Sequence, residues 1–133
     1  MEGELEEISD DLEGAELLLK RLAGAGSGEP PEEKKIWLVY LTVEKSVALL
    51  KLYLSIESPG LFVTIKSSPK DWAGLLARAS EALGDGRHLF RERKLEQALE
   101  ALRTSRNCLR VVLRDLRRLR LRAVRAGNRR RRG

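Results

Sequence analysis

The chain has 133 residues, with 26 Lys and Arg against 20 Asp and Glu, so its formal net charge is +6. This length suits one domain with a modest core and is too short for two independent ones. A single cysteine and a single histidine exclude a disulfide framework and a zinc site built from several thiolates or imidazoles. We therefore expect no metal, no cofactor and no enzymatic activity. The charge-rich, amide-poor composition is typical of hyperthermophile proteins.

The charge is unevenly distributed along the chain. Residues 1–35 hold 11 acids and 4 bases, a net charge of −7. Residues 36–84 hold 4 acids and 5 bases, whereas residues 85–133 hold 5 acids and 17 bases, a net charge of +12. Such asymmetry predicts either a basic binding surface or neutralisation of one end by the other within the fold.

Residues 1–22 are predicted to form an acidic amphipathic helix with a coiled-coil-like seam, because their apolar residues alternate at spacings of three and four. This seam comprises Leu5, Ile8, Leu12, Ala15, Leu19 and Leu22. Residues 23–31 have the composition of a flexible linker, 32–126 form the predicted helical core, and 127–133 are a basic tail. The first residues are acidic where a secretory signal is basic and then apolar, so we expect a cytoplasmic protein.

A second helix is predicted from Pro31 to about Glu57. It is apolar nearly all round, which favours a central position in a bundle and places its aromatic residues in the core. Three charges within residues 36–56 disfavour a membrane span, since each costs about 2.5–3.5 kcal/mol near a bilayer centre. Residues 61–66 resemble a strand without a pairing partner and are interpreted as an extended connector. The aromatic residues of the second helix that are expected in the core are Trp37, Tyr40 and Tyr53.

Two further helices complete an all-α, four-helix bundle with coiled-coil-like first and last helices. The third is predicted from Pro69 to about Arg91, running through residues 84–86 with a close helix crossing at the glycines. Residues 91–94 form a turn, and the fourth helix begins at Leu95 and closes at Gly127. Its seam keeps the same alternation throughout: Leu95, Ala98, Leu102, Ser105, Leu109, Val112, Leu116, Leu119, Ala123 and Ala126.

The hairpin from Ala79 to Arg110 resembles the core of a small archaeal family of uncharacterised helical proteins. The family pattern is an alanine, an Asp-small segment leading to an aromatic or apolar pair, a short charged turn and an alanine-rich return helix. Matching residues here cover about a quarter of the chain, although the family usually has an acid where Arg110 stands. They are Ala79, Asp85, Gly86, Leu89, Phe90, the turn 91–94, Ala98, Ala101 and Leu109.

The same hairpin also looks like HEPN-type helical domains, whose nuclease members carry an arginine followed several residues later by a histidine on one helix. No arginine stands at that spacing before His88. The resemblance therefore implies a non-catalytic member. Asp85 or Glu92 can hydrogen-bond His88, but this spacing is common by chance. Cys108, at the edge of the last seam, is interpreted as a small buried side chain.

The arginine-rich last helix is the strongest functional feature. From Arg103 onwards there are 13 arginines and one acid, Asp115, and no arginine falls on the apolar seam. Guanidinium groups bind phosphate in a fork, and a concentrated basic stripe is typical of nucleic-acid binding. No aromatic residue interleaves with these arginines, so duplex or structured RNA is expected rather than stacked bases. The predicted binding residues are Arg103, Arg106, Arg110, Arg114, Arg117, Arg118, Arg122, Arg125, Arg129, Arg130, Arg131 and Arg132.

The alternative is a protein-interaction module in which the basic helix pairs with an acidic helix. That acidic helix is either residues 1–22 of the same chain or a helix of a partner. A homo-oligomer, a dimer through the first helix or the far end of the fourth, is also expected, because both carry heptad-like seams.

The nucleic-acid hypothesis predicts a steep salt dependence. If about six phosphates of duplex DNA were engaged, a plot of the log of the binding constant against the log of the salt concentration would have a slope near −5.

Overall fold

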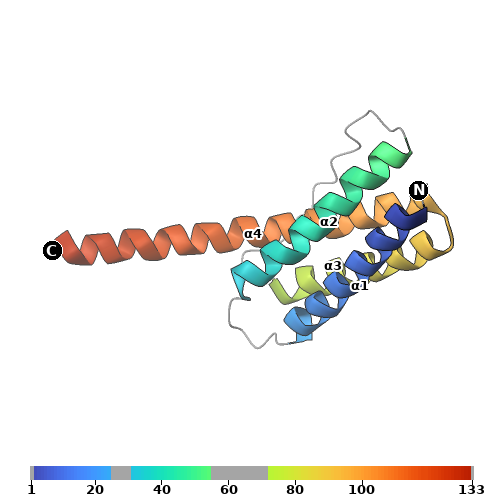
Figure 1. Ribbon diagram of the computed structural model, residues 1–133. Coiled ribbons are helices and arrows are strands. Elements are labelled where there is room, and N and C mark those ends of the chain that lie inside the picture. The colour runs from blue at the N-terminus through green and yellow to red at the C-terminus, as the bar shows by residue number, and fades with distance from the viewer. Residues whose placement is uncertain (1, 25–30, 55–71, 133) are drawn as a thin grey trace.

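The computed structural model describes residues 2–24, 31–54 and 72–132, which form four helices (Figure 1). Helix α1 spans Glu2–Gly24, α2 spans Glu33–Tyr53, α3 spans Trp72–Arg91 and α4 spans Leu95–Arg132. The predicted all-α four-helix bundle is confirmed. Most of the predicted linker (25–30), the connector at 61–66 and the start of the third helix lie outside the described residues. Within the described ranges, no helix has both the length and the apolar character needed to cross a membrane.

The four helices are arranged in a ring in which each packs on two neighbours. Helix α1 packs on α2 and α3, and α4 packs on the same two helices; the described residues of α1 and α4 make no close backbone approach. The predicted seams supply the core: Leu12 and Leu19 of α1 and Leu102 and Leu109 of α4 are fully buried. Removing this apolar surface from water is the main stabilising contribution to such a bundle.

Helices α3 and α4 form the most extensive interface, an antiparallel hairpin. Helix α3 runs uninterrupted through the glycines, as predicted, and Gly86 is buried against α4. A Cβ atom at Gly86 would lie 2.8 Å from Cδ2 of Leu102, so any larger residue would force this fully buried side chain to shift. The Ser105 hydroxyl donates a buried hydrogen bond of 2.8 Å to the carbonyl of Ala79 and so also joins the two helices.

The predicted turn between α3 and α4 is a helix-capping motif. The amide of Lys94 donates to the carbonyl of Leu89 at 3.0 Å, and the amide of Arg93 donates to that of Phe90 at 3.1 Å. This pair of bonds satisfies the last carbonyls of α3 and requires a left-handed residue between helix and turn. Arg93 takes that conformation, with φ of 62°. The tight reversal places α4 directly back along α3.

The prediction that the second helix is central and buried all round is wrong. One face of α2 is buried, with Val43 and Leu50 fully enclosed, but the opposite face is open to solvent. In a ring of four, a helix touches only its two neighbours, which leaves an outward arc uncovered whatever its composition. Trp37 and Tyr53, predicted to be core residues, are 43% and 42% exposed.

The predicted end of the fourth helix at Gly127 is also wrong, because α4 continues to Arg132. Nothing lies within 4 Å of a Cβ placed on Gly127 among the described residues, so this glycine serves no close packing. Glycine costs about 1 kcal/mol relative to alanine inside a helix, and the surrounding arginines and alanines are good helix formers. The local preference of the neighbours therefore outweighs one unfavourable residue.

Candidate nucleic-acid interface

Helix α4 has two parts that differ in their surroundings. Residues 95–116, the bundle part, pack between α2 and α3, and their seam is buried as far as Leu116. Residues 117–132 form the projecting arm, whose first turn still lies beside α2, where Arg120 pairs with Glu33, and whose C-terminal part extends beyond the other helices (Figure 1). In the arm the seam continues, but Leu119 is already 40% exposed and every residue from 117 to 127 is open to solvent.

Two of the predicted phosphate-binding residues, Arg103 and Arg106, are not displayed on the surface. Arg103 is buried and donates from Nη1 to Oε1 of Glu100, three residues earlier on the same helix, at 2.8 Å. Arg106 is largely covered and lies 3.6 Å from a carboxylate oxygen of Glu44 on α2. Because α4 packs against two helices at once, its buried arc is wider than its leucine seam and includes these flanking positions.

The next two arginines, Arg110 and Arg114, lie at the edge of the bundle and are exposed. Arg110 donates from Nη2 to the Tyr40 hydroxyl at 3.2 Å and lies 3.8 Å from Glu44. The hydrogen bond to Tyr40, more than the nearby carboxylate, raises the pKa of Arg110 above its usual value, so it stays charged. Arg114 lies 3.9 Å from its neighbour Asp115.

The arginines of the arm are the most open. Arg117, Arg118, Arg122 and Arg125 are exposed, and none has a carboxylate within 4.0 Å among the described residues. Arg120, which the sequence-based set omitted, is exposed as well and pairs with Glu33 of α2 at 3.2 Å. The helix backbone carries Arg129 to Arg132 to the tip of the arm, but their side chains lie outside the described part of the chain.

Among the described residues, no acid of α1 lies within 4.0 Å of an arginine of α4 and the two helices make no close backbone approach, so the expected pairing of the first and last helices within one chain is not formed there. Helix α1 directs its carboxylates to bases of α2 and α3 instead. Glu16, which is buried, lies 2.6 Å from Arg87, and the more exposed Asp11 and Glu13 lie near bases of their own. The acids that do meet α4 come from α2, namely Glu33 and Glu44.

Aromatic and basic side chains meet in a groove between α2 and α4 that the sequence did not predict. It has a volume of about 450 Å³ and includes Trp37 and Tyr40. A signal for it exists in the sequence, since residues 33, 37, 40 and 44 recur at helical spacing beside the buried face of α2 and face α4 together. The groove is lined by Glu33, Trp37, Tyr40, Arg110, Leu113, Arg114, Arg117 and Arg120.

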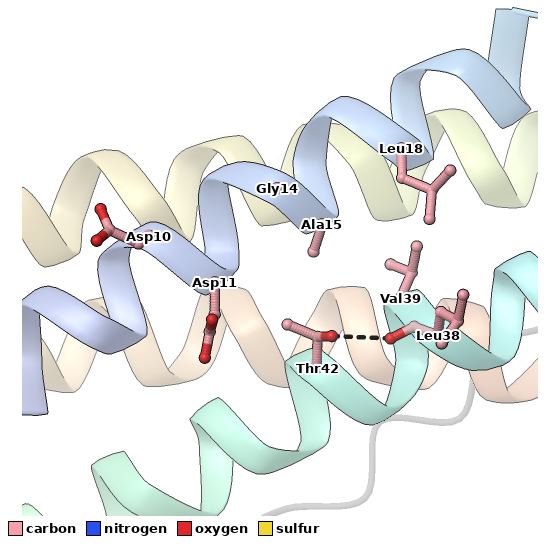
Figure 2. A pocket seen from close by; sticks show the side chains of 8 residues that line it. All are labelled: Asp10, Asp11, Gly14, Ala15, Leu18, Leu38, Val39 and Thr42. Atoms are coloured by element: carbon pink, nitrogen blue, oxygen red, sulfur yellow. Dashed lines mark hydrogen bonds between the residues drawn. The ribbon is translucent and has the colours of Figure 1, made fainter.

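A second hollow lies between α1 and α2 and has the opposite character. Figure 2 shows Asp10 and Asp11 on its α1 side, with Leu18 and Leu38 at the other end. Its volume is about 290 Å³, and the Thr42 hydroxyl donates a 2.8 Å hydrogen bond to the carbonyl of Leu38 within it. Carboxylates without a lining base make this hollow unsuited to phosphate, so the candidate interface lies on the α4 side of the molecule.

The remaining candidate groups have ordinary structural environments. His88 is exposed and lies 2.7 Å from Glu92, one of the two partners that its spacing allowed. Cys108 is fully buried, as predicted, and burial raises the pKa of its thiol. Among the described residues, no three His, Cys, Asp or Glu side chains gather in a group that could hold a metal ion.

Comparisons with known proteins give no relative for this chain. No family model, no curated protein and no solved structure matches it. The resemblances of the 79–110 hairpin to an archaeal helical family and to HEPN-type domains therefore stay predictions. The candidate interface is accordingly defined by its own geometry: an exposed arginine arm continuous with an aromatic–arginine groove.

Proposed function

We propose that the protein binds nucleic acid without catalysis and that the arginines of the projecting arm of α4 contact the phosphates of duplex or structured RNA. One observation carries the proposal: Arg117, Arg118, Arg122 and Arg125 are exposed without a carboxylate within 4.0 Å among the described residues. Elsewhere on the described surface, many bases lie near an acid, as Lys20 does near Glu16. Unpaired guanidinium groups on a rigid helix are suited to phosphate, which they bind in a fork.

The shape of the arm also suits a nucleic-acid duplex. Its 16 residues span about 24 Å at 1.5 Å per residue, long enough to follow several successive phosphates. Arginines leave the helix in several directions, so both walls of a groove can be contacted at once. Contacts of this kind position a protein on the backbone and carry little sequence information. We therefore expect binding that depends strongly on salt and weakly on base sequence.

Salt-dependent titration tests this proposal. Binding of a fluorescent duplex DNA and of an RNA hairpin is measured between about 50 and 200 mM salt, where engagement of six phosphates of the DNA gives a slope near −5. The triple variant R118Q/R122Q/R125Q should reduce the magnitude of that slope by about 3. The matched control R91Q/R93Q/K94Q removes the same charge at the opposite end of α4 and should bind almost as the wild type does. Absence of binding at low salt, or equal losses in the two variants, would overturn the proposal.

A second candidate partner is an acidic amphipathic helix of another protein. It is favoured by Leu119, Leu121 and Val124, which are 40%, 43% and 55% exposed between the arginines of the arm. A helical partner would bury them, whereas phosphates would not. The double variant L121Q/V124Q separates the candidates, because it should leave nucleic-acid affinity intact and weaken capture of an acidic helical peptide.

The predicted homo-oligomer also stays a proposal, and the exposed apolar residues of the arm bear on it. Of the two surfaces expected to pair, the α1 seam is used inside the bundle, where Ile8 and Leu12 are buried. The exposed apolar residues of the arm are the other surface. Repulsion between two arginine-rich arms opposes their pairing. Dimerisation is therefore expected only with a bound polyanion, and sedimentation with and without a short duplex measures it.

A further inference from the structure

The groove between α2 and α4 combines two features that a phosphate-binding helix alone does not need. Four arginines line it (Arg110, Arg114, Arg117 and Arg120), and two aromatic rings stand among them. Trp37 and Tyr40 contact each other edge to face, with ring centroids 5.5 Å apart and an interplanar angle of 88°. Arginine and aromatic side chains together are the chemistry that binds a planar, anionic ligand.

The two aromatic rings differ in how they are held. Tyr40 is partly buried, and its hydroxyl accepts a hydrogen bond from Arg110. Trp37 is 43% exposed beside it and is braced by the Tyr40 ring. An indole that is ordered by its neighbour and still open to solvent is a stacking platform, and a base stacked on such a ring contributes about 1–3 kcal/mol.

The charges of the groove favour an anion despite the carboxylate in its lining. Glu33 forms an ion pair with Arg120, whose Nη1 lies 3.2 Å from each of the two carboxylate oxygens. Glu44 lies further along α2, outside the groove lining, and is shared by Arg106 and Arg110. Arg114 lies 3.9 Å from Asp115 of its own helix, whereas Arg117 has no carboxylate within 4.0 Å among the described residues. The groove therefore keeps a positive charge next to an exposed indole.

We propose that this groove takes an unpaired base and its phosphate, so that the protein binds where a single strand leaves a duplex. This inference rests on the proposed function, because the adjoining duplex is held by the projecting arm. Arg117 belongs to both surfaces, lining the groove and beginning the arm, so one nucleic-acid backbone can pass from one to the other. The volume of about 450 Å³ lies in the range of ordinary small-ligand pockets.

The experiment compares two RNA hairpins that share one stem. One is blunt, and the other carries a three-nucleotide single-stranded overhang. The overhang should increase affinity about tenfold, which corresponds to about 1.4 kcal/mol, within the range for stacking one base. Trp37→Ala should abolish that difference, so that the variant binds the two hairpins with equal affinity. Leu38→Ala is the matched control, since Leu38 is 60% exposed on the same helix and does not line the groove.

Tryptophan fluorescence gives a second readout that does not depend on a destabilised variant. The chain has two tryptophans, so Trp72→Phe leaves Trp37 as the sole indole. The overhang hairpin should quench it, whereas the blunt hairpin and an overhang of abasic nucleotides should not. The proposal that the protein binds at such a junction would be overturned by equal affinity of the wild type for both hairpins. It would also be overturned if free nucleoside monophosphate quenched the fluorescence as strongly as the overhang does.

The two proposals fail in different ways. If the blunt hairpin binds and the arm variant R118Q/R122Q/R125Q weakens it, but the overhang adds nothing, the groove inference is wrong and the arm proposal stands. If neither hairpin binds at low salt, the arm proposal is wrong and the junction proposal fails with it.

Discussion

The bundle part and the projecting arm of α4 share one sequence pattern and have opposite surroundings. Both carry apolar residues at spacings of three and four, and both are rich in arginine. In the bundle part, Leu109 is fully buried and Arg106 lies beside Glu44. In the arm, Leu119 is 40% exposed and Arg118 has no carboxylate within 4.0 Å among the described residues. The same pattern of apolar and basic residues is therefore buried and paired where neighbouring helices extend alongside α4, and exposed where they end.

Truncating one leucine in each part of α4 tests whether the bundle part is packed and the arm is exposed in solution. Leu109→Ala should lower the free energy of unfolding by about 2–5 kcal/mol, because it opens a cavity in a closed core. Leu119→Ala, the same chemical change ten residues on, should cost below about 1 kcal/mol at a largely exposed site. Urea denaturation followed by circular dichroism measures both. Equal losses would mean that the arm is packed in solution.

Substituting one glycine beside the bundle part and one in the arm by alanine should change the stability by smaller amounts and in opposite directions. Gly86→Ala should destabilise the bundle by about 1–3 kcal/mol, because the new Cβ would lie 2.8 Å from Cδ2 and 3.0 Å from Cγ of the fully buried Leu102. Gly127→Ala meets nothing within 4 Å among the described residues and should stabilise the arm by about 1 kcal/mol. Hydrogen exchange of the arm amides should then slow about fivefold. Faster exchange after Gly127→Ala would contradict a continuous helix through this residue.

The smallest expected effect is a pH dependence at the closed end of the hairpin. The hydrogen bond and charge of Lys94, followed by the charge of His88, lower the pKa of Glu92 below 4.5. A lowered folded-state pKa means that the stabilisation is present above the unfolded-state value and is lost as the pH falls through the folded-state value. The wild type should therefore be slightly more stable than Glu92→Gln at pH 7, and the advantage should vanish in acid. Glu81→Gln, an exposed acid of α3, is the control, and parallel pH profiles of wild type and Glu92→Gln would contradict the effect.

Much of the fold could be predicted because the pattern that specifies it is local. The seam of α1, the seam of α4 as far as Leu116, the course of α3 through Gly86 and the turn after Arg91 were all predictable from local residue patterns, and the structure confirms them. The rest of the predicted α4 seam, from Leu119 onwards, is exposed. The end of α4 was misplaced at Gly127, because one poor helix former was given more weight than its good neighbours.

The candidate site was predicted only in part. The arginine stripe was evident, but the burial of Arg103 and the cover on Arg106 depend on α2 and α3 flanking α4 together. Trp37 was placed in the core since an apolar helix predicts burial, whereas a ring of four helices leaves its outward arc open. The aromatic–arginine groove joins residues about 70 positions apart in the chain, such as Tyr40 and Arg110, and no local spacing predicts which stripes will meet.

The amino-acid pattern alone is enough to predict an all-helical chain, an acidic stretch over its first 35 residues and a last helix with arginines around an apolar seam. Which charges meet depends on how the helices pack. Helix α1 lies diagonal to α4, so its acids pair with bases of α2 and α3. The glutamates of α2 reach Arg106, Arg110 and, at the start of the arm, Arg120. The physical reason is that helix propensity and seam spacing are local properties, whereas charge pairing requires side chains within a few ångströms, which packing alone arranges.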